Sequence, residues 1–278
     1  MILKTFDVIQ KVQVHVPFHL LRERYLPFVL KSRLRPEISF NHKSLDYFKK
    51  SDFIETAKRL AGSGLTVTFH APFHDLRPGA LDPKIRQQTI DRLKQVFDLI
   101  PYYHPIAVVC HPAFDAKYYV SAEQIWLENS MDTWRYFLSL IKDTGTIITL
   151  ENVYEEDPRY LKSLFSTISS PQLRFCFDTG HFNTFSKVPL EVWMNEMSEW
   201  IGQLHIHDND GSSDEHLALG EGTFPFLKFF QWIHNSNLQP IVTIEAHAEE
   251  TLLKALDNIE KMGLSKLIQP PAAVALKS

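Results

Sequence analysis

Short strand-like segments alternate with helical patterns along this chain, and that repeat constrains the fold more than any other feature. Each segment is mostly apolar and β-branched over four or five residues, which is typical of strands covered on both faces. The predicted strands cover residues 12–16, 37–40, 65–69, 106–110, 147–150, 174–177, 203–206 and 241–244. A strand followed by a helix eight times predicts a closed (β/α)8 TIM barrel, an α/β fold in a single domain. An open doubly wound sheet is the alternative, but no glycine-rich dinucleotide turn follows the first predicted strand.

The helical patterns between the strands have recognisable ends. Pro83 and Pro101 bracket one amphipathic stripe, and residues 190–201 form another. Ser121 and Gln124 have the spacing of a capping box. We therefore expect a helix that Ser121 caps.

The length of the chain, 278 residues, suits one α/β barrel of about 250 residues. We expect the barrel domain to cover residues 1–268 and residues 269–278 to form a flexible C-terminal tail. No apolar run exceeds five residues, which excludes a membrane-spanning helix. The first twenty residues lack the apolar region of a signal peptide, so export is not expected.

Charge and cysteine content narrow the class of protein further. The net charge of −4 provides no general positive field that would hold nucleic acid. The two cysteines, Cys110 and Cys176, are too few for a disulfide framework and fit a reducing compartment. A cytoplasmic location is therefore expected. Neither cysteine lies beside an obvious activating base, so we expect both to pack in the core.

Six of the predicted strands carry a histidine, aspartate or glutamate at or near the carboxyl end. These residues are His70, His111, Glu151, Asp178, His205 and Glu245. In a barrel the carboxyl ends of the strands converge on one rim, where catalytic residues lie. Six such groups at one mouth would repel one another or lose hydration unless a cation compensates them. Mixed imidazole and carboxylate ligands suit divalent zinc, manganese or iron, and no thiol is placed for a structural thiolate site.

The number of these residues exceeds what one ion needs. One ion takes three or four protein ligands, and Glu151, Asp178, His205 and Glu245 would satisfy it. Five further residues then remain for additional ions: His70, His111, His181, Asp214 and His216. The excess predicts two or three ions, with zinc favoured.

The motifs around these residues resemble a known family. They are His70-Ala71-Pro72-Phe73, His111-Pro112, Glu151-Asn152, Asp178-Thr179-Gly180-His181, His205-Ile206-His207-Asp208 and Asp214-Glu215-His216-Leu217-Ala218-Leu219-Gly220-Glu221-Gly222. From about Leu65 to Glu245 the chain resembles the xylose-isomerase-like barrel superfamily, and within it the endonuclease IV branch, also called the type-2 AP endonucleases. The first two predicted strands carry no diagnostic residue.

The resemblance implies a three-metal arrangement. It assigns His70 and His111 to a first metal, with Glu151 bridging to a second. It assigns Asp178, His205 and Glu245 to that second metal, and His181, Asp214 and His216 to a third. His207, Glu221 and His74 have no ligand role in the family and are expected to support the ligands from outside.

The chemistry implied is phosphodiester hydrolysis at two or three metals. A metal-bound hydroxide is available near neutral pH because coordination lowers the pKa of water towards about 7. The ions also stabilise negative charge on the phosphoryl oxygens. Mild acidity, and Phe73 where the family usually has tyrosine, favour a small phosphodiester over duplex DNA.

Three alternatives stay open. A sugar or sugar-phosphate isomerase or epimerase would use one metal, with Glu151 and Glu245 as proton-transfer bases on opposite faces of the substrate. An abasic-site DNA endonuclease would use the three-metal site on duplex DNA, so nucleic acid remains a possible partner. A catalytically idle barrel would act as a binding module.

Overall fold

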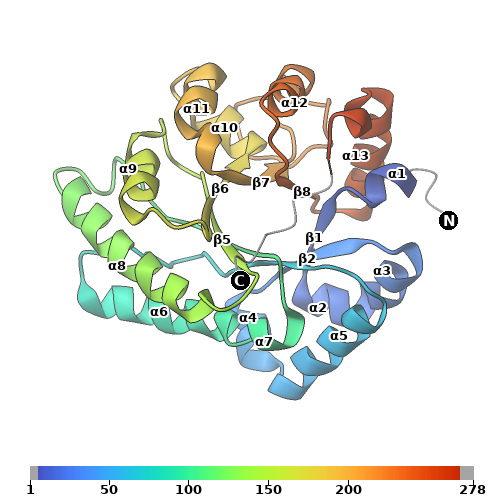
Figure 1. Cartoon of the computed structure of the whole chain (residues 1–278), viewed down its shortest axis with the longest axis horizontal. Helices are drawn as coiled ribbons and strands as arrows, with labels where there is room; N and C mark the ends of the chain where they lie inside the picture. The colour runs from blue at the N-terminus through green and yellow to red at the C-terminus, as the bar shows by residue number, and fades with distance from the viewer. Residues whose placement is uncertain (1–5, 270–278) are drawn as a thin grey trace.

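A computed structural model describes residues 6–269 of the chain. In it, eight parallel strands close into a barrel in the order β1 to β8, and helices surround the barrel (Figure 1). The strands are β1 (Gln13–Pro17), β2 (Arg35–Ser39), β3 (Thr68–His70), β4 (Ala107–Cys110), β5 (Ile147–Glu151), β6 (Leu173–Asp178), β7 (Ile201–Ile206) and β8 (Ile241–Ile244). The predicted TIM barrel and its eight strands are confirmed.

The helices follow the strands as the repeat predicts, with several short additions. They are α1 (Phe6–Ile9), α2 (Phe18–Leu20), α3 (Leu26–Ser32), α4 (His42–Tyr47), α5 (Lys50–Gly62), α6 (Pro83–Phe97), α7 (Ile100–Tyr103), α8 (Glu123–Ile141), α9 (Arg159–Ile168), α10 (Thr179–Phe185), α11 (Leu190–Met197), α12 (Phe226–Asn235) and α13 (Glu249–Lys261). A π-helical turn, Leu21–Tyr25, joins α2 to α3, and 3₁₀ turns cover Ser198–Trp200 and Leu264–Lys266.

Three predicted helix boundaries are wrong. The stripe that Pro83 and Pro101 bracket ends early, because α6 ends at Phe97 and Pro101 lies inside α7. Ser121 does not cap α8: Ala122 occupies the N-cap position without a side-chain bond, and Ser121 lies before it with a left-handed φ of 61°. The backbone turn at Ser121 therefore takes its hydroxyl out of the capping position. The predicted stripe over 190–201 also runs too far, because Ile201 already begins β7.

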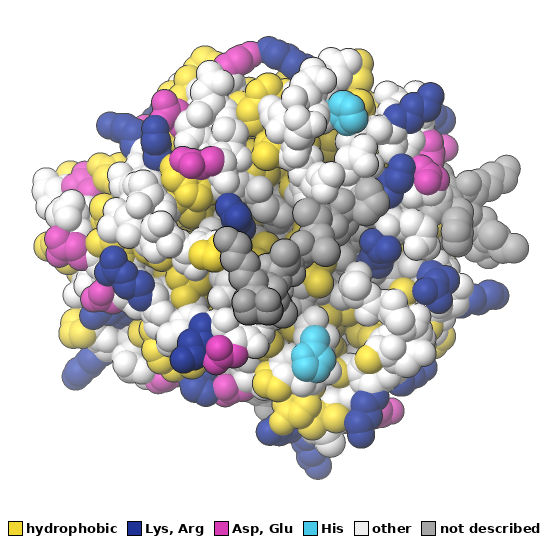
Figure 2. Space-filling view, in the orientation of Figure 1, with side chains coloured by type: hydrophobic (Ala, Val, Ile, Leu, Met, Phe, Trp, Pro, Cys, Tyr) yellow, Lys and Arg dark blue, Asp and Glu magenta, His cyan; other side chains and the backbone are white. Residues whose placement is uncertain are grey.

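Three further features are the C-terminal end of the chain, the length of its helices and the charges on its surface. Of the expected tail, residues 269–278, all but Gln269 lie outside the described residues. Among the described helices, none is long and apolar enough to cross a membrane. On the face drawn in Figure 2, basic and acidic side chains are interspersed, and no broad patch carries a single sign.

Strand register brings the polar strand ends to the same level of the barrel. Asp178 pairs with His205 across β6 and β7, and Glu151 pairs with Cys176 across β5 and β6. Because all strands run parallel, their carboxyl ends open on one mouth. The sheet therefore gathers side chains that lie far apart in the sequence.

Aromatic side chains fill the space between the sheet and the helices. Phe229 of α12 is fully buried, and its ring centroid lies 5.1 Å from that of Phe177 on β6 and 5.4 Å from that of Phe224. Ring pairs at these separations add to the free energy of apolar burial. This cluster packs α12 against β6, the strand that carries Asp178.

We predict that Phe229→Ala lowers the free energy of unfolding by about 3–5 kcal/mol, because it leaves a cavity in the packed cluster. Leu227 on the same helix is 48% exposed, so Leu227→Ala should change that free energy by less than about 0.5 kcal/mol. Urea denaturation of both variants measures the difference. Equal losses would contradict the assignment of Phe229 to the core.

Candidate metal centre

The structure brings all nine predicted metal-ligand residues to the carboxyl-end mouth of the barrel. His70, Glu151 and Asp178 are the last residues of β3, β5 and β6. The others follow or lie in neighbouring elements: His111 after β4, His181 in α10, His205 in β7, Asp214 and His216 between β7 and α12, and Glu245 after β8. Their donor atoms form several groups that could each hold a metal ion. Metal binding itself remains a prediction.

The central group consists of Glu151, Asp178, His205 and Glu245. One donor atom of each lies within 4.8 Å of the others, and all four side chains are buried. His205 Nδ1 is 3.3 Å from Glu151 Oε1 and 3.6 Å from Glu245 Oε1. Three carboxylates facing one imidazole nitrogen form a cage that suits one divalent cation.

Glu151 also belongs to a second group, with His70 and His111. Its Oε2 lies 3.3 Å from His70 Nε2 and 3.1 Å from His111 Nε2. Its other oxygen faces the central group. Glu151 therefore stands between the two groups, as a bridging carboxylate does.

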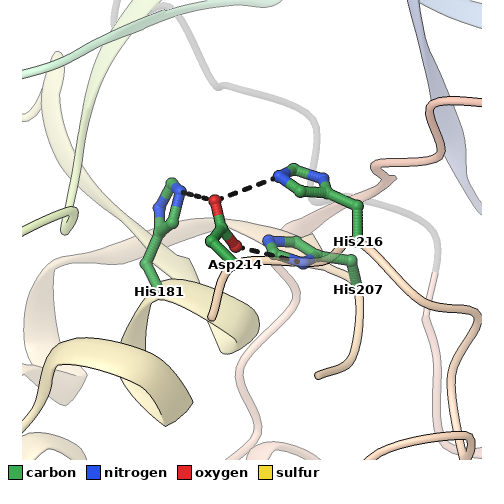
Figure 3. Close-up of side chains that lie close together, drawn as sticks. All are labelled: His181, His207, Asp214 and His216. Atoms are coloured by element: carbon green, nitrogen blue, oxygen red, sulfur yellow. Dashed lines mark hydrogen bonds and ion pairs between the residues drawn. The ribbon is translucent and has the colours of Figure 1, made fainter. Parts of the chain in front are cut away.

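The third group surrounds Asp214, as Figure 3 shows. Asp214 Oδ2 lies 3.3 Å from His181 Nε2 and 3.2 Å from His216 Nε2. His207 also joins this group, since its Nδ1 lies 3.8 Å from Asp214 Oδ1. The ring of His207 stacks on that of His216 at 3.8 Å, and its Nε2 lies 3.0 Å from Asp178 Oδ1. His207 thus connects the third group to the central one.

The two other residues expected to support the ligands lie further out. His74 lines the cavity above the centre, and its ring stacks on that of Phe73. Glu221 is exposed and forms an ion pair with Lys254. Neither belongs to one of the donor groups found among the described residues.

The donor atoms fit a cation because they are buried without hydrogen bonds. Both oxygens of Glu151, Nε2 of His111 and Nδ1 of His205 and of His216 are buried and have no hydrogen-bond partner in the described chain. A buried polar atom left unpaired costs free energy. Imidazole nitrogens and carboxylate oxygens turned towards each other at this spacing are the donor set of zinc, manganese or iron.

The charges of the centre shift the pKa values of its members in opposite directions. Burial raises the pKa of Glu151, but the imidazoles of His205 and His111 outweigh burial and hold that pKa well below its ordinary value. Burial lowers the pKa of His181, but Asp178 and Asp214 outweigh it and raise that pKa well above its ordinary value. Without a cation the imidazoles whose pKa is raised, such as His181, therefore hold protons that compensate the carboxylates. A divalent ion would replace those protons.

A cavity of about 680 Å³ opens above the centre. Phe73 borders it on one side, and Tyr154 and Phe185 border it on another. Among the described lining residues Arg77 is the single lysine or arginine. Its guanidinium lies 4.0 Å from the centroid of the Tyr118 ring. The cavity suits a small polar molecule better than a nucleic-acid backbone, which needs several cationic contacts.

Sequence reasoning missed two residues on the first two strands. His15 on β1 reaches within 4.0 Å of Glu245, and Glu37 on β2 lies 3.0 Å from His205. The signal for Glu37 was a charged residue at the first position of the predicted strand 37–40. Such a residue points into a barrel only where partners compensate it.

The expectation for the cysteines is half right. Both thiols are buried, as predicted. However, Cys176 lies against His205 and Glu151, close enough to form a donor group with them, so the expectation that no base or ligand set lies nearby is wrong. Strand pairing, which the sequence does not show, places Cys176 opposite Glu151. Burial raises the pKa of the Cys176 thiol far above its ordinary value.

The family follows from a comparison with family models. Residues 37–262 match the model described as xylose isomerase-like TIM barrel. The chain belongs to this family. The resemblance to xylose-isomerase-like barrels that the sequence motifs indicated is therefore confirmed. A curated relative from Methanocaldococcus jannaschii, the uncharacterized protein MJ1311, is 28% identical over 187 residues, which are 64% of this chain and 64% of the relative.

Solved structures show the same fold. A D-tagatose 3-epimerase-like protein superposes with a TM-score of 0.78 at 21% identity and covers 91% of this chain and 97% of its own. D-psicose 3-epimerase from Clostridium cellulolyticum H10 superposes with a TM-score of 0.73 at 13% identity and covers 93% and 100%. At these identities the likeness establishes the fold alone.

We predict that Gly180→Ala disturbs the centre, because a Cβ at this position would collide with the ring of His207. Overpacking of this kind lowers the free energy of unfolding by about 1–3 kcal/mol. Gly62 is a matched control, since a Cβ there meets nothing within 4 Å, and Gly62→Ala should be neutral or slightly stabilising. Urea denaturation measures both. A neutral Gly180→Ala would contradict the close approach.

We also predict a pH effect from Glu155, a buried carboxyl beside the centre. Its Oε2 accepts a hydrogen bond of 2.6 Å from the Val153 amide, and burial raises its pKa to about 7. The unfolded pKa is about 4.3, so the folded chain holds a proton that the unfolded chain has lost. Rising pH between these values lowers stability, by up to about 1.4 kcal/mol per pH unit.

The test compares wild type with Glu155→Gln in metal-free buffer, by urea denaturation from pH 4 to pH 8. The variant carries no proton at this site to lose. Wild type should therefore lose stability relative to the variant as pH rises, and the difference should level off above about pH 7. Parallel profiles would show that Glu155 is ionised in the folded protein.

Proposed function

We propose that the chain is a metal-dependent epimerase or isomerase of a small sugar. The observation that carries the proposal is the pairing of two carboxylates, Glu151 and Glu245, around His205 Nδ1 in the central group. They come from β5 and from the end of β8, three strands apart around the barrel. A substrate bound between them would present a different face to each.

The chemistry needs two bases of this kind. When bound, a divalent ion polarises the carbonyl and hydroxyl oxygens of a ketose and makes the adjacent C–H group more acidic. One glutamate, ionised, would take the proton from that carbon, and the other, carrying a proton taken up from solvent, would return it to the opposite face, which inverts the centre. The low pKa of Glu151 and of Glu245 keeps whichever glutamate accepts the proton ionised beforehand.

Two further observations support a small sugar as substrate. The cavity holds about 680 Å³, within the range of about 300–1,000 Å³ for small-molecule sites. Aromatic side chains at its rim, Phe73 and Tyr154, can pack against the apolar face of a sugar ring. Two proteins that share the fold are named a D-tagatose 3-epimerase-like protein and a D-psicose 3-epimerase.

We predict that the manganese- or zinc-loaded protein exchanges a ketose C–H proton with solvent deuterium and epimerises that carbon. Glu151→Gln and Glu245→Gln should each lower the rate by about 10²–10⁴, the usual contribution of a general acid or base. The exposed Glu221→Gln is the control and should retain activity. NMR of a ketose panel in D₂O measures both exchange and epimerisation. Absence of exchange on every ketose and ketose phosphate would refute the proposal.

A second function is favoured by one specific observation, the two additional donor groups. A single-metal epimerase has no use for His70 with His111 or for Asp214 with His216. A phosphoric-ester hydrolase would use two or three ions held by these groups and Glu151. Elemental analysis should then find two or three ions per chain, and His216→Ala should lose one.

The substrates separate the two functions. A hydrolase would cleave bis-p-nitrophenyl phosphate, and a DNA enzyme would nick duplex DNA with an abasic site. One ion per chain, with no cleavage of either substrate, would refute the hydrolase. Several ions together with cleavage, and without deuterium exchange, would retire the epimerase.

A further inference from the structure

A charged side chain that belongs to none of the donor groups lies buried directly below the metal centre. Glu37 on β2 is fully buried. Its Oε1 lies 3.0 Å from His205 Nε2, on the side of the ring away from the cavity. Among the described ion pairs of Glu37 none involves a lysine or arginine. Its charge must therefore be stabilised by the groups that surround it.

Hydrogen-bond donors from three other strands hold Glu37 in place. Its Oε2 accepts from Thr68 Oγ1 at 2.9 Å, Gln203 Nε2 at 2.6 Å and Thr243 Oγ1 at 3.1 Å. Thr149 on β5 in turn donates to Gln203 Oε1 at 3.0 Å. A carboxylate with this many donors has one orientation, because each alternative would leave a buried donor unpaired.

The two nitrogens of His205 face different surroundings. Nε2 faces the carboxylate of Glu37, which offers only acceptors and therefore requires a hydrogen on Nε2. A contact of 3.5 Å from Gln203 Nε2 to the same nitrogen is too long to compete. Nδ1 faces the three carboxylates of the central group and has no hydrogen-bond partner in the described chain.

We infer that Glu37 is a positioning residue that fixes the tautomer of His205, so that Nε2 carries the hydrogen and Nδ1 is presented to the metal. Such a carboxylate orients the imidazole ring and raises the basicity of the nitrogen that binds. The inference rests on metal binding by the central group, which the proposed function also needs. It does not depend on which reaction follows.

The first test uses the wild-type zinc-loaded protein with ¹⁵N-labelled histidine. The ¹⁵N shifts of His205, assigned by their loss in His205→Gln, should show zinc on Nδ1 and a hydrogen-bonded N–H at Nε2. Zinc on Nε2 would overturn the inference without any need for a variant of Glu37.

The second test measures zinc affinity by competition with a chromophoric chelator. Glu37→Gln should weaken binding by about 10–100-fold, the usual effect of removing such a partner. Thr146→Val is the matched control, because it removes a buried hydrogen bond, from Thr146 Oγ1 to the Pro105 carbonyl, that lies outside the network around Glu37. It should retain wild-type affinity. Equal losses in both variants, or no loss in Glu37→Gln, would overturn the inference.

Neither readout uses turnover, so the two proposals fail separately. A protein that binds zinc through Nδ1 of His205 and epimerises no sugar refutes the proposed function alone. A protein that epimerises a sugar with unchanged zinc affinity in Glu37→Gln refutes the role of Glu37 alone.

Discussion

The carboxylate of Glu151 is the contact on which the mouth of the barrel depends. It is almost fully buried, and imidazoles from β3, β4, α10 and β7 lie within 3.3 Å of its two oxygens. A buried carboxylate with neither cation nor protonated partner would be strongly destabilising. The histidines around Glu151 therefore cannot be exchanged independently. The lowered pKa of Glu151 and the raised pKa of His181 and His205 follow from this requirement.

Polar groups also occupy the barrel interior below this centre. Glu37, Gln203, Thr68, Thr149 and Thr243 form a hydrogen-bonded layer that joins β2, β3, β5, β7 and β8. In many barrels apolar side chains fill this space. Here the layer supports His205 from beneath. The ring of His205 contacts Glu37 of this layer through Nε2 and faces Glu151 of the central group through Nδ1. Support of this kind keeps ligands within the narrow geometry that catalysis needs.

The same mouth can serve two chemistries, since a barrel carries function in its strand ends rather than in its fold. In the proposed epimerase or isomerase, the central group alone would carry out proton transfer between the faces of the sugar. The outer groups, around His111 and around Asp214, could hold further metal ions. Their positive charge would stabilise a phosphoryl group during its transfer. A cavity with Arg77 as its one described lysine or arginine, and with aromatic walls, limits either reaction to small substrates.

The sequence by itself determined the barrel and the six residues at its strand ends, because strand composition and the position of a residue at a strand end are local properties. The motifs around His181, Asp214 and His216 added the other three residues at the mouth through their resemblance to the family. The cap of α8 was mispredicted, since the left-handed turn at Ser121 depends on how its loop packs. Only the tertiary structure decided which donors face each other, that Cys176 and His207 join them, and that Glu37 lies under His205. Those contacts join residues far apart in the sequence, Glu37 and His205 by 168 positions. The register and curvature of the closed sheet set these contacts, which no local pattern records.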